Sequence, residues 1–227
     1  RTRRTPFSGG SGVLPQNPGQ ARYVFVVAWG SLAVTGGIGM FLTYVRGLSL
    51  LPLGVAGIVL IVTYTRWITK HPIWCLLAPG LAFGPLMVMG TDFILTGRYS
   101  QASLVVSLIP FFLVNGLLLL NQFPDYEADQ TVGRRTLPIV LGRSRAAVVY
   151  MFFLGATYGI LFGSGYGEIL PRWCWLGLIP GVAALPLMIG VWRHAEDTEG
   201  LLRYMGWNVV LTISTPVLAG TGLLLAR

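Results

Sequence analysis

Long apolar runs constrain the fold of this chain more than any other feature of its sequence. Seven of them are visible, at about 23–45, 48–64, 73–95, 102–120, 146–162, 173–192 and 205–226. Most have the roughly twenty residues that an α-helix needs to cross the hydrocarbon core of a bilayer. Their apolar residues are continuous rather than alternating, which favours helices over a barrel. The sequence therefore predicts an all-α, polytopic membrane bundle with seven transmembrane helices in one membrane-embedded domain, residues 1–227.

The charged residues are too few for a protein covered by water. They make up 11% of the chain, whereas 54% of the residues are hydrophobic, and roughly a quarter of the residues of a soluble domain are charged. The net charge of +8 does not indicate nucleic-acid binding, because the basic residues lie in short loops and set topology instead. The expected surroundings are the lipid bilayer, and no nucleic-acid partner is expected.

The distribution of basic residues predicts the orientation. If the seven runs span the membrane, twelve of the sixteen Lys and Arg residues fall on one face. They are Arg1, Arg3, Arg4, Arg22, Arg66, Lys70, Arg134, Arg135, Arg143, Arg145, Arg193 and Arg203. Six of the eight acidic residues fall on the same face. The positive-inside rule assigns this face to the cytoplasm of an inner (cell) membrane, with residues 1–22 and 121–145 as cytoplasmic loops.

The third run has features of its own. It contains Pro79, Gly80, Gly84 and Pro85, which predict a kink or close packing against a neighbouring helix. Asp92, near its outer end, is expected to be paired or to reach the outer membrane surface.

A polar segment, NQFPDYEADQTVGRRT, follows the fourth run directly. Asn121, Asp125 and Asp129 are spaced so that they would share one side of a helix, if the fourth helix continues through them. Stacked carboxylates repel each other unless a cation lies between them. Oxygen ligands without His or Cys suit Mg²⁺, which completes its shell with water and phosphate. Arg134 and Arg135 follow at a distance suited to phosphate oxygens.

A less specific interpretation is that this segment is only a solvated turn between two helices. Tyr126 and Glu127 are expected to point away from the aspartates into solvent. The segment 193–203, with three acidic residues, is either a lid over the site or, more simply, a solvated loop. A D-x-x-x-D pattern alone is weak, but its position after an apolar run and before GRRTLPIVLG is more specific.

The string NQFPDYEADQTVGRRTLPIVLG resembles the second aspartate-rich motif of the UbiA superfamily of intramembrane prenyltransferases. The matching residues are Asn121, Asp125, Asp129, Gly133, Arg134, Arg135, Thr136, Leu137 and Gly142. The variant is most similar to the menaquinone-type branch, which prenylates 1,4-dihydroxy-2-naphthoate. The resemblance implies a total of nine helices, with a first aspartate motif on a second helix that would precede Arg1. On this interpretation, the chain alone holds at most one Mg²⁺ and is inactive.

The resemblance also implies a reaction and its residues. A polyprenyl group would pass from an allylic polyprenyl diphosphate to an aromatic acceptor. Asp125 and Asp129, assisted by Asn121, would hold Mg²⁺ as the catalytic metal ligands. Arg4, Arg134, Arg135 and Lys70 would bind the diphosphate, and Tyr64 and Arg66 are candidates for the substrate pocket. One departure is Cys75-Leu76, where the family often has Gly-Glu, and it weakens any assignment of the acceptor.

Two alternatives remain from the sequence. The same chemistry would serve other acceptors, namely 4-hydroxybenzoate, homogentisate, a tetrapyrrole or a glycerol phosphate ether. A membrane transporter is the alternative from another class. Transporters tend to place ionisable groups near the membrane midplane and to show internal repeats. Here the charges gather at one face and no repeat is visible, which favours the transferase.

Overall fold

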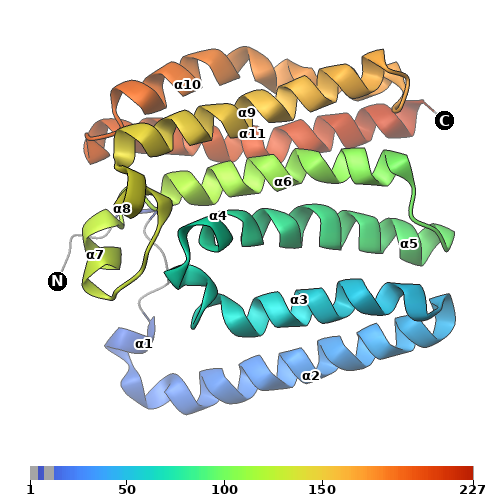
Figure 1. The fold of residues 1–227 in the computed structure, drawn as a ribbon, viewed down its shortest axis with the longest axis horizontal. Helices are drawn as coiled ribbons and strands as arrows, with labels where there is room; N and C mark the ends of the chain where they lie inside the picture. The colour runs from blue at the N-terminus through green and yellow to red at the C-terminus, as the bar shows by residue number, and fades with distance from the viewer. Residues whose placement is uncertain (1–4, 8–12, 227) are drawn as a thin grey trace.

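The computed structural model describes residues 5–7 and 13–226, and these residues form α-helices and related helical turns with no strand (Figure 1). The long helices are α2 (Ala21–Arg46), α3 (Leu51–Tyr64), α6 (Gln101–Asn121), α9 (Arg143–Tyr166) and α11 (Thr198–Leu225). Two further rods are composite: α4 (Pro72–Leu81), η4 (Ala82–Met89) and α5 (Gly90–Thr96); and η5 (Arg172–Ala183) with α10 (Ala184–Arg193). Short helices are α1 (Val13–Gln16), α7 (Tyr126–Thr131) and α8 (Leu137–Leu141).

Six of these rods are long and apolar enough to cross a membrane, and the apolar helix Leu48–Tyr64 is shorter. The predicted all-α membrane bundle is therefore confirmed. The loops are less simple than expected. Within 1–22, α1 and one 3₁₀ turn (Pro18–Gln20) precede α2, and within 121–145 the chain forms α7 and α8.

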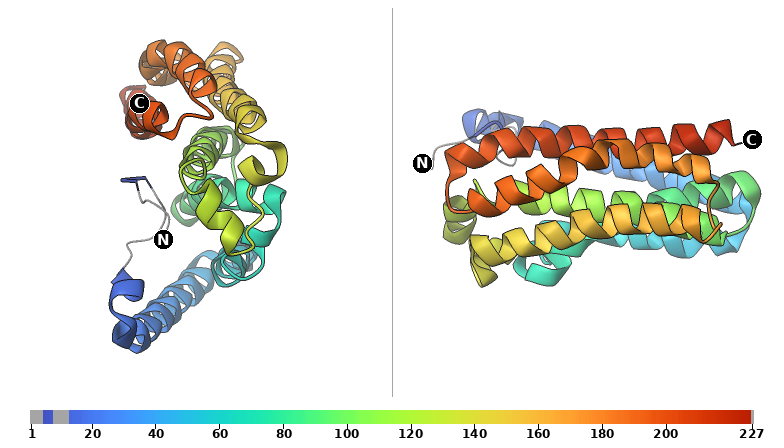
Figure 2. Two further views of the ribbon diagram at one scale, coloured as in Figure 1. Left: turned by 90° about the vertical axis from the view of Figure 1, so that its left-hand side faces the viewer. Right: turned by 90° about the horizontal axis from the view of Figure 1, so that it is seen from above.

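The connections alternate between the two ends of the bundle (Figure 1). Residues 65–71, 122–142 and 194–197 lie at one end, which we call the aspartate end. Residues 47–50, 97–100 and 167–171 lie at the other, which we call the opposite end. Viewed along the bundle, the rods follow an open arc from α2 to α10 and α11 (Figure 2).

Burial is lowest at the α2 end of this arc, where neither α2 nor α3 has a buried residue. In contrast, α6, α9 and α11 supply most of the core, including Leu119, Tyr150 and Met205. Inside this core the Tyr150 hydroxyl donates to Asn208 Oδ1 at 2.8 Å. Hydrogen bonds of this kind join helices where neither water nor other polar groups compete.

The rod formed by α4 and η4 packs closely on α6, as its glycines predicted. The Gly80 amide donates to Asn115 Oδ1 at 2.6 Å. A Cβ at Gly84 would lie 2.5 Å from the Ser107 carbonyl oxygen and 2.8 Å from Phe111 Cβ. Small residues four apart allow two helix backbones to approach this closely. Around Pro85, which has no N–H to donate, the helix widens into the π-helical stretch η4.

Candidate functional site

The helix that leads into the polar segment does not continue through it. α6 ends at Asn121, and a turn around Pro124 separates it from α7, which begins at Tyr126. The expectation of one continuous helix face is therefore wrong, because a proline removes a helical hydrogen bond. Asp125 instead lies at the start of α7, and its carbonyl accepts the Asp129 amide at 2.8 Å. Asp125 and Asp129 are still one helical turn apart, while Asn121 belongs to the preceding helix.

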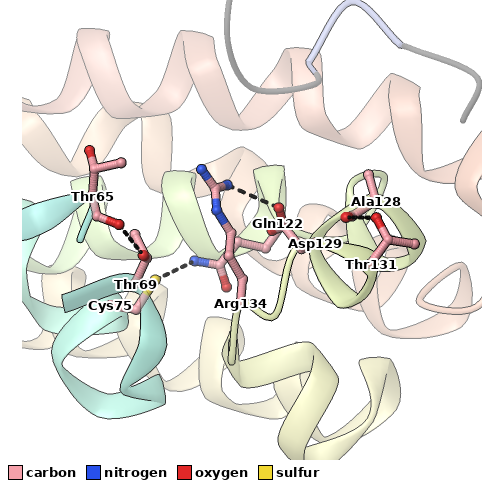
Figure 3. Close-up of polar contacts among 8 residues, drawn as sticks. All are labelled: Thr65, Thr69, Cys75, Gln122, Ala128, Asp129, Thr131 and Arg134. Carbon is pink, nitrogen blue, oxygen red and sulfur yellow. Dashed lines mark hydrogen bonds and ion pairs between the residues drawn. The ribbon is translucent and has the colours of Figure 1, made fainter. Parts of the chain in front are cut away.

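Asp129 and Arg134 form an ion pair at the aspartate end (Figure 3). Arg134 Nη1 donates to Asp129 Oδ1 at 2.9 Å, and the Arg134 amide donates to the Asp129 carbonyl at 3.0 Å. The chain turns back between them at Gly133, whose φ of 72° is readily adopted by glycine. Asp129 is only 6% exposed, whereas the Arg134 side chain is 43% exposed. The arginine side chain therefore stays partly exposed while it neutralises a buried carboxylate.

The surroundings of Asp129 disfavour its negative charge despite this arginine. Burial raises the pKa of Asp129 above its ordinary value, and the nearby charge of Asp125 raises it further. Arg134 opposes both effects through its charge and its hydrogen bond. A second cation close to the two carboxylates would relieve the remaining cost.

The donor atoms suit Mg²⁺. Within 5–7 and 13–226, no three His, Cys, Asp or Glu residues gather into a metal-binding group. However, Mg²⁺ usually takes one or two carboxylates and leaves its other positions to water and phosphate. Asp125 and Asp129 supply such a pair, and Asn121 is half-buried at the adjoining end of α6.

A second connection lies directly against this segment. The Arg135 amide donates to the Thr69 carbonyl at 3.3 Å, and Gln122 Nε2 contacts Cys75 Sγ at 3.8 Å (Figure 3). Thr69 is held in turn by its hydroxyl, which donates to the Thr65 carbonyl at 2.9 Å. Residues 65–75 and 122–136 are thus joined into one surface at the aspartate end.

The other predicted site residues lie at different distances from this centre. Tyr64, at the end of α3, lies close enough to Cys75, Asp129 and Arg134 to interact with their charges. Arg66, Lys70 and Arg135 are exposed and belong to the connections at the same end. Arg4 lies outside the residues that the structure describes.

Sequence reasoning missed a contact behind α7. The Arg143 guanidinium lies 4.7 Å from the centre of the Tyr126 ring. Tyr126 is half-buried, so its expected exposure to solvent is wrong, whereas Glu127 is exposed as predicted. No sequence pattern indicates this pair, because it depends on how α7 and the start of α9 meet. Gln122 and Cys75 were likewise not predicted to touch.

Fold and site together define an α-helical membrane protein that carries two aspartates and an arginine at one end of its bundle. Residues 20–210 match the UbiA prenyltransferase family, and the chain belongs to this family. The 1,4-dihydroxy-2-naphthoate octaprenyltransferase of Bacillus subtilis (strain 168) is 29% identical over 83 residues. That match covers 37% of this chain and only 25% of the relative, so the chain spans a quarter of the length of that protein. No solved structure matches the chain.

These matches confirm the resemblance that the motif around Asp125 and Asp129 indicated. The Bacillus relative also agrees with the menaquinone-type branch.

Proposed function

We propose that this chain transfers a polyprenyl group from an allylic polyprenyl diphosphate to an aromatic acceptor, with 1,4-dihydroxy-2-naphthoate as the preferred acceptor. Family membership supports the reaction class, and the activity for which the Bacillus relative is named supports the acceptor. The observation that carries the proposal is the buried Asp129, one turn after Asp125 and paired with Arg134. This arrangement suits a diphosphate group that arrives with its metal ion.

The proposed roles of the residues follow from their charges. Asp125 and Asp129, with Asn121, would hold Mg²⁺, which supplies positive charge to the diphosphate oxygens. Arg134 is proposed to meet the diphosphate oxygens that the metal would leave uncovered, because its side chain is 43% exposed. Arg135 and Lys70, exposed in connections at the same end, are proposed to add positive charge where negative charge grows as the C–O bond breaks. Arg4 is proposed for the same role.

The acceptor then attacks the allylic carbon, and a C–C bond forms as the diphosphate leaves. With 1,4-dihydroxy-2-naphthoate, the ring carboxylate is lost in this step. Tyr64 and Arg66 are proposed to border the acceptor, since Tyr64 lies within electrostatic range of Asp129 and Arg134. The site is proposed to face the cytoplasm, and the prenyl tail would extend between the helices and the lipid.

The test is a product assay in lipid nanodiscs with Mg²⁺, a polyprenyl diphosphate and a panel of aromatic acceptors. We expect prenylated, decarboxylated naphthoate as the main product. Selective use of another acceptor would reassign the substrate. Absence of product from every acceptor, with folded protein, would contradict the proposal.

A further inference from the structure

α7 carries the candidate metal ligand Asp129 and directly follows Asp125, but it is too short to be stable by itself. It has only six residues, Tyr126–Thr131, between the Pro124 turn and Gly133. Helices this short are unstable in isolation, because each turn must be fixed before it gains hydrogen bonds. The separation between Asp125 and Asp129 therefore depends on contacts that α7 makes with other parts of the bundle.

Arg143 provides such a contact from the first turn of α9. Its guanidinium lies 4.7 Å from the centre of the Tyr126 ring, which directly follows Asp125 in the chain. A guanidinium over an aromatic face is attracted by the ring electrons, more strongly where water is excluded. Both residues are half-buried, so the contact is partly shielded from solvent.

The same arginine also reaches a third segment. Arg143 Nη1 donates to the Glu196 carbonyl at 3.5 Å, and the adjacent Ser144 hydroxyl donates to Glu196 Oε1 at 2.9 Å. Glu196 lies in the connection between α10 and α11, which the sequence left as either a lid or a solvated loop. Arg143 thus joins α7, the start of α9 and this connection.

We propose that Arg143 is a positioning residue, which holds α7 through Tyr126 so that Asp125 and Asp129 keep a metal-binding arrangement. This inference rests on the proposed function and adds a residue that acts through α7 rather than on the substrate. Loss of Arg143 should loosen α7 and raise the Mg²⁺ requirement. It should leave the maximal rate at saturating Mg²⁺ largely unchanged.

The first experiment needs no catalysis. Amide hydrogen exchange is measured on residues 1–227 in nanodiscs for Arg143→Gln, Tyr126→Leu and Tyr126→Phe. We expect faster exchange within 126–132 for Arg143→Gln and Tyr126→Leu, but not for Tyr126→Phe, which retains an aromatic face. The matched control is Arg145→Gln, an exposed arginine one half-turn further along α9. Unchanged exchange in Arg143→Gln would overturn the inference.

The second experiment measures how Mg²⁺ activates prenyl transfer by the protein in nanodiscs. We expect the half-saturating Mg²⁺ concentration to rise by up to about tenfold in Arg143→Gln, the size of effect that a shielded cation–π contact produces. The double variant with Tyr126→Leu should be no worse than the worse single variant, because both changes remove one contact. Additive losses would contradict the coupling.

The outcomes separate the two proposals. If amide exchange in Arg143→Gln is faster throughout the bundle, that variant has lost general stability and is not informative about α7. The comparison of Tyr126→Phe with Tyr126→Leu then tests the contact, and equal exchange rates within 126–132 in these two variants would refute the inference. If the folded protein transfers no prenyl group to any acceptor, the proposed function fails whatever the exchange data show. If transfer occurs and neither exchange nor Mg²⁺ activation responds to Arg143, only the positioning role fails.

Discussion

The two ends of the bundle are connected in different ways. At the aspartate end, contacts join segments far apart in the chain, such as Arg135 with Thr69, Gln122 with Cys75, and Ser144 with Glu196. At the opposite end most polar contacts are local, as between Ser100 and Asp92, or Arg172 and Glu168. The bond from Tyr99 to the Ser49 carbonyl is an exception. The comparison indicates that the opposite end closes turns, whereas the aspartate end assembles a surface from several connections.

The largest difference between the ends should appear when one acid is neutralised at each. Asp129→Asn removes a proposed metal ligand and should lower kcat/KM by about 10²–10³-fold, comparable to the loss of a group that stabilises transition-state charge. Asp92→Asn should leave kcat/KM unchanged, because the Asp92 carboxylate lies at the opposite end, where it accepts a hydrogen bond from Ser100. Steady-state rates of prenyl transfer measure both. Equal losses would remove the distinction between the ends.

A pair of arginines sharpens the same comparison. Arg134→Gln should weaken diphosphate binding by about tenfold or more, because a charge-assisted hydrogen bond is lost. Arg172→Gln is the control, since its partner Glu168 is 3.8 Å away and both side chains are largely exposed. Competition by inorganic diphosphate against prenyl transfer gives the affinities. A comparable loss in Arg172→Gln would indicate a general charge effect.

Metal binding at the aspartate end should also depend on pH, with a smaller effect. The pKa of Asp129 is raised by burial, so this carboxyl takes up a proton at a higher pH than an exposed aspartate. A protonated carboxyl does not bind metal, so Mn²⁺ affinity should fall by about tenfold per pH unit below that pKa. The decline should begin above the ordinary aspartate range. Paramagnetic resonance of bound Mn²⁺ measures it, and a decline confined to the ordinary range would contradict the role of burial.

Removing the hydroxyl of one serine at each end should have the smallest effect. Ser100 caps α6 by accepting the Ser103 amide at 3.0 Å and also donates to Asp92, so Ser100→Ala should lower the unfolding free energy by about 1 kcal/mol. Ser144→Ala removes an exposed bond to Glu196 and should change stability by less than about 0.5 kcal/mol. Denaturant titration in detergent compares them. A larger loss in Ser144→Ala would show that the aspartate end also carries stability.

The sequence predicted the parts of this molecule that depend on local chemistry. Apolar runs located the rods, and Gly80 and Gly84 predicted the close packing of α4 and η4 on α6. The spacing of Asn121, Asp125 and Asp129 indicated a candidate site, which stays a prediction, but the single helix assumed for it was wrong because Pro124 interrupts the helix. The contacts of Arg143 with Tyr126 and of Gln122 with Cys75 could not be predicted. They arise from the meeting of segments that only the folded bundle brings together.

The contact between η4 and α6 has a mechanical consequence. A methyl group at Gly84 would lie 2.5 Å from the Ser107 carbonyl oxygen, so the two rods leave no room there for one further carbon atom. We therefore expect these rods to move together when the surrounding membrane deforms, and helices without buried residues, such as α2, to move more freely. Cys75 and Gln122, near the ends of these rods, would then keep their spacing.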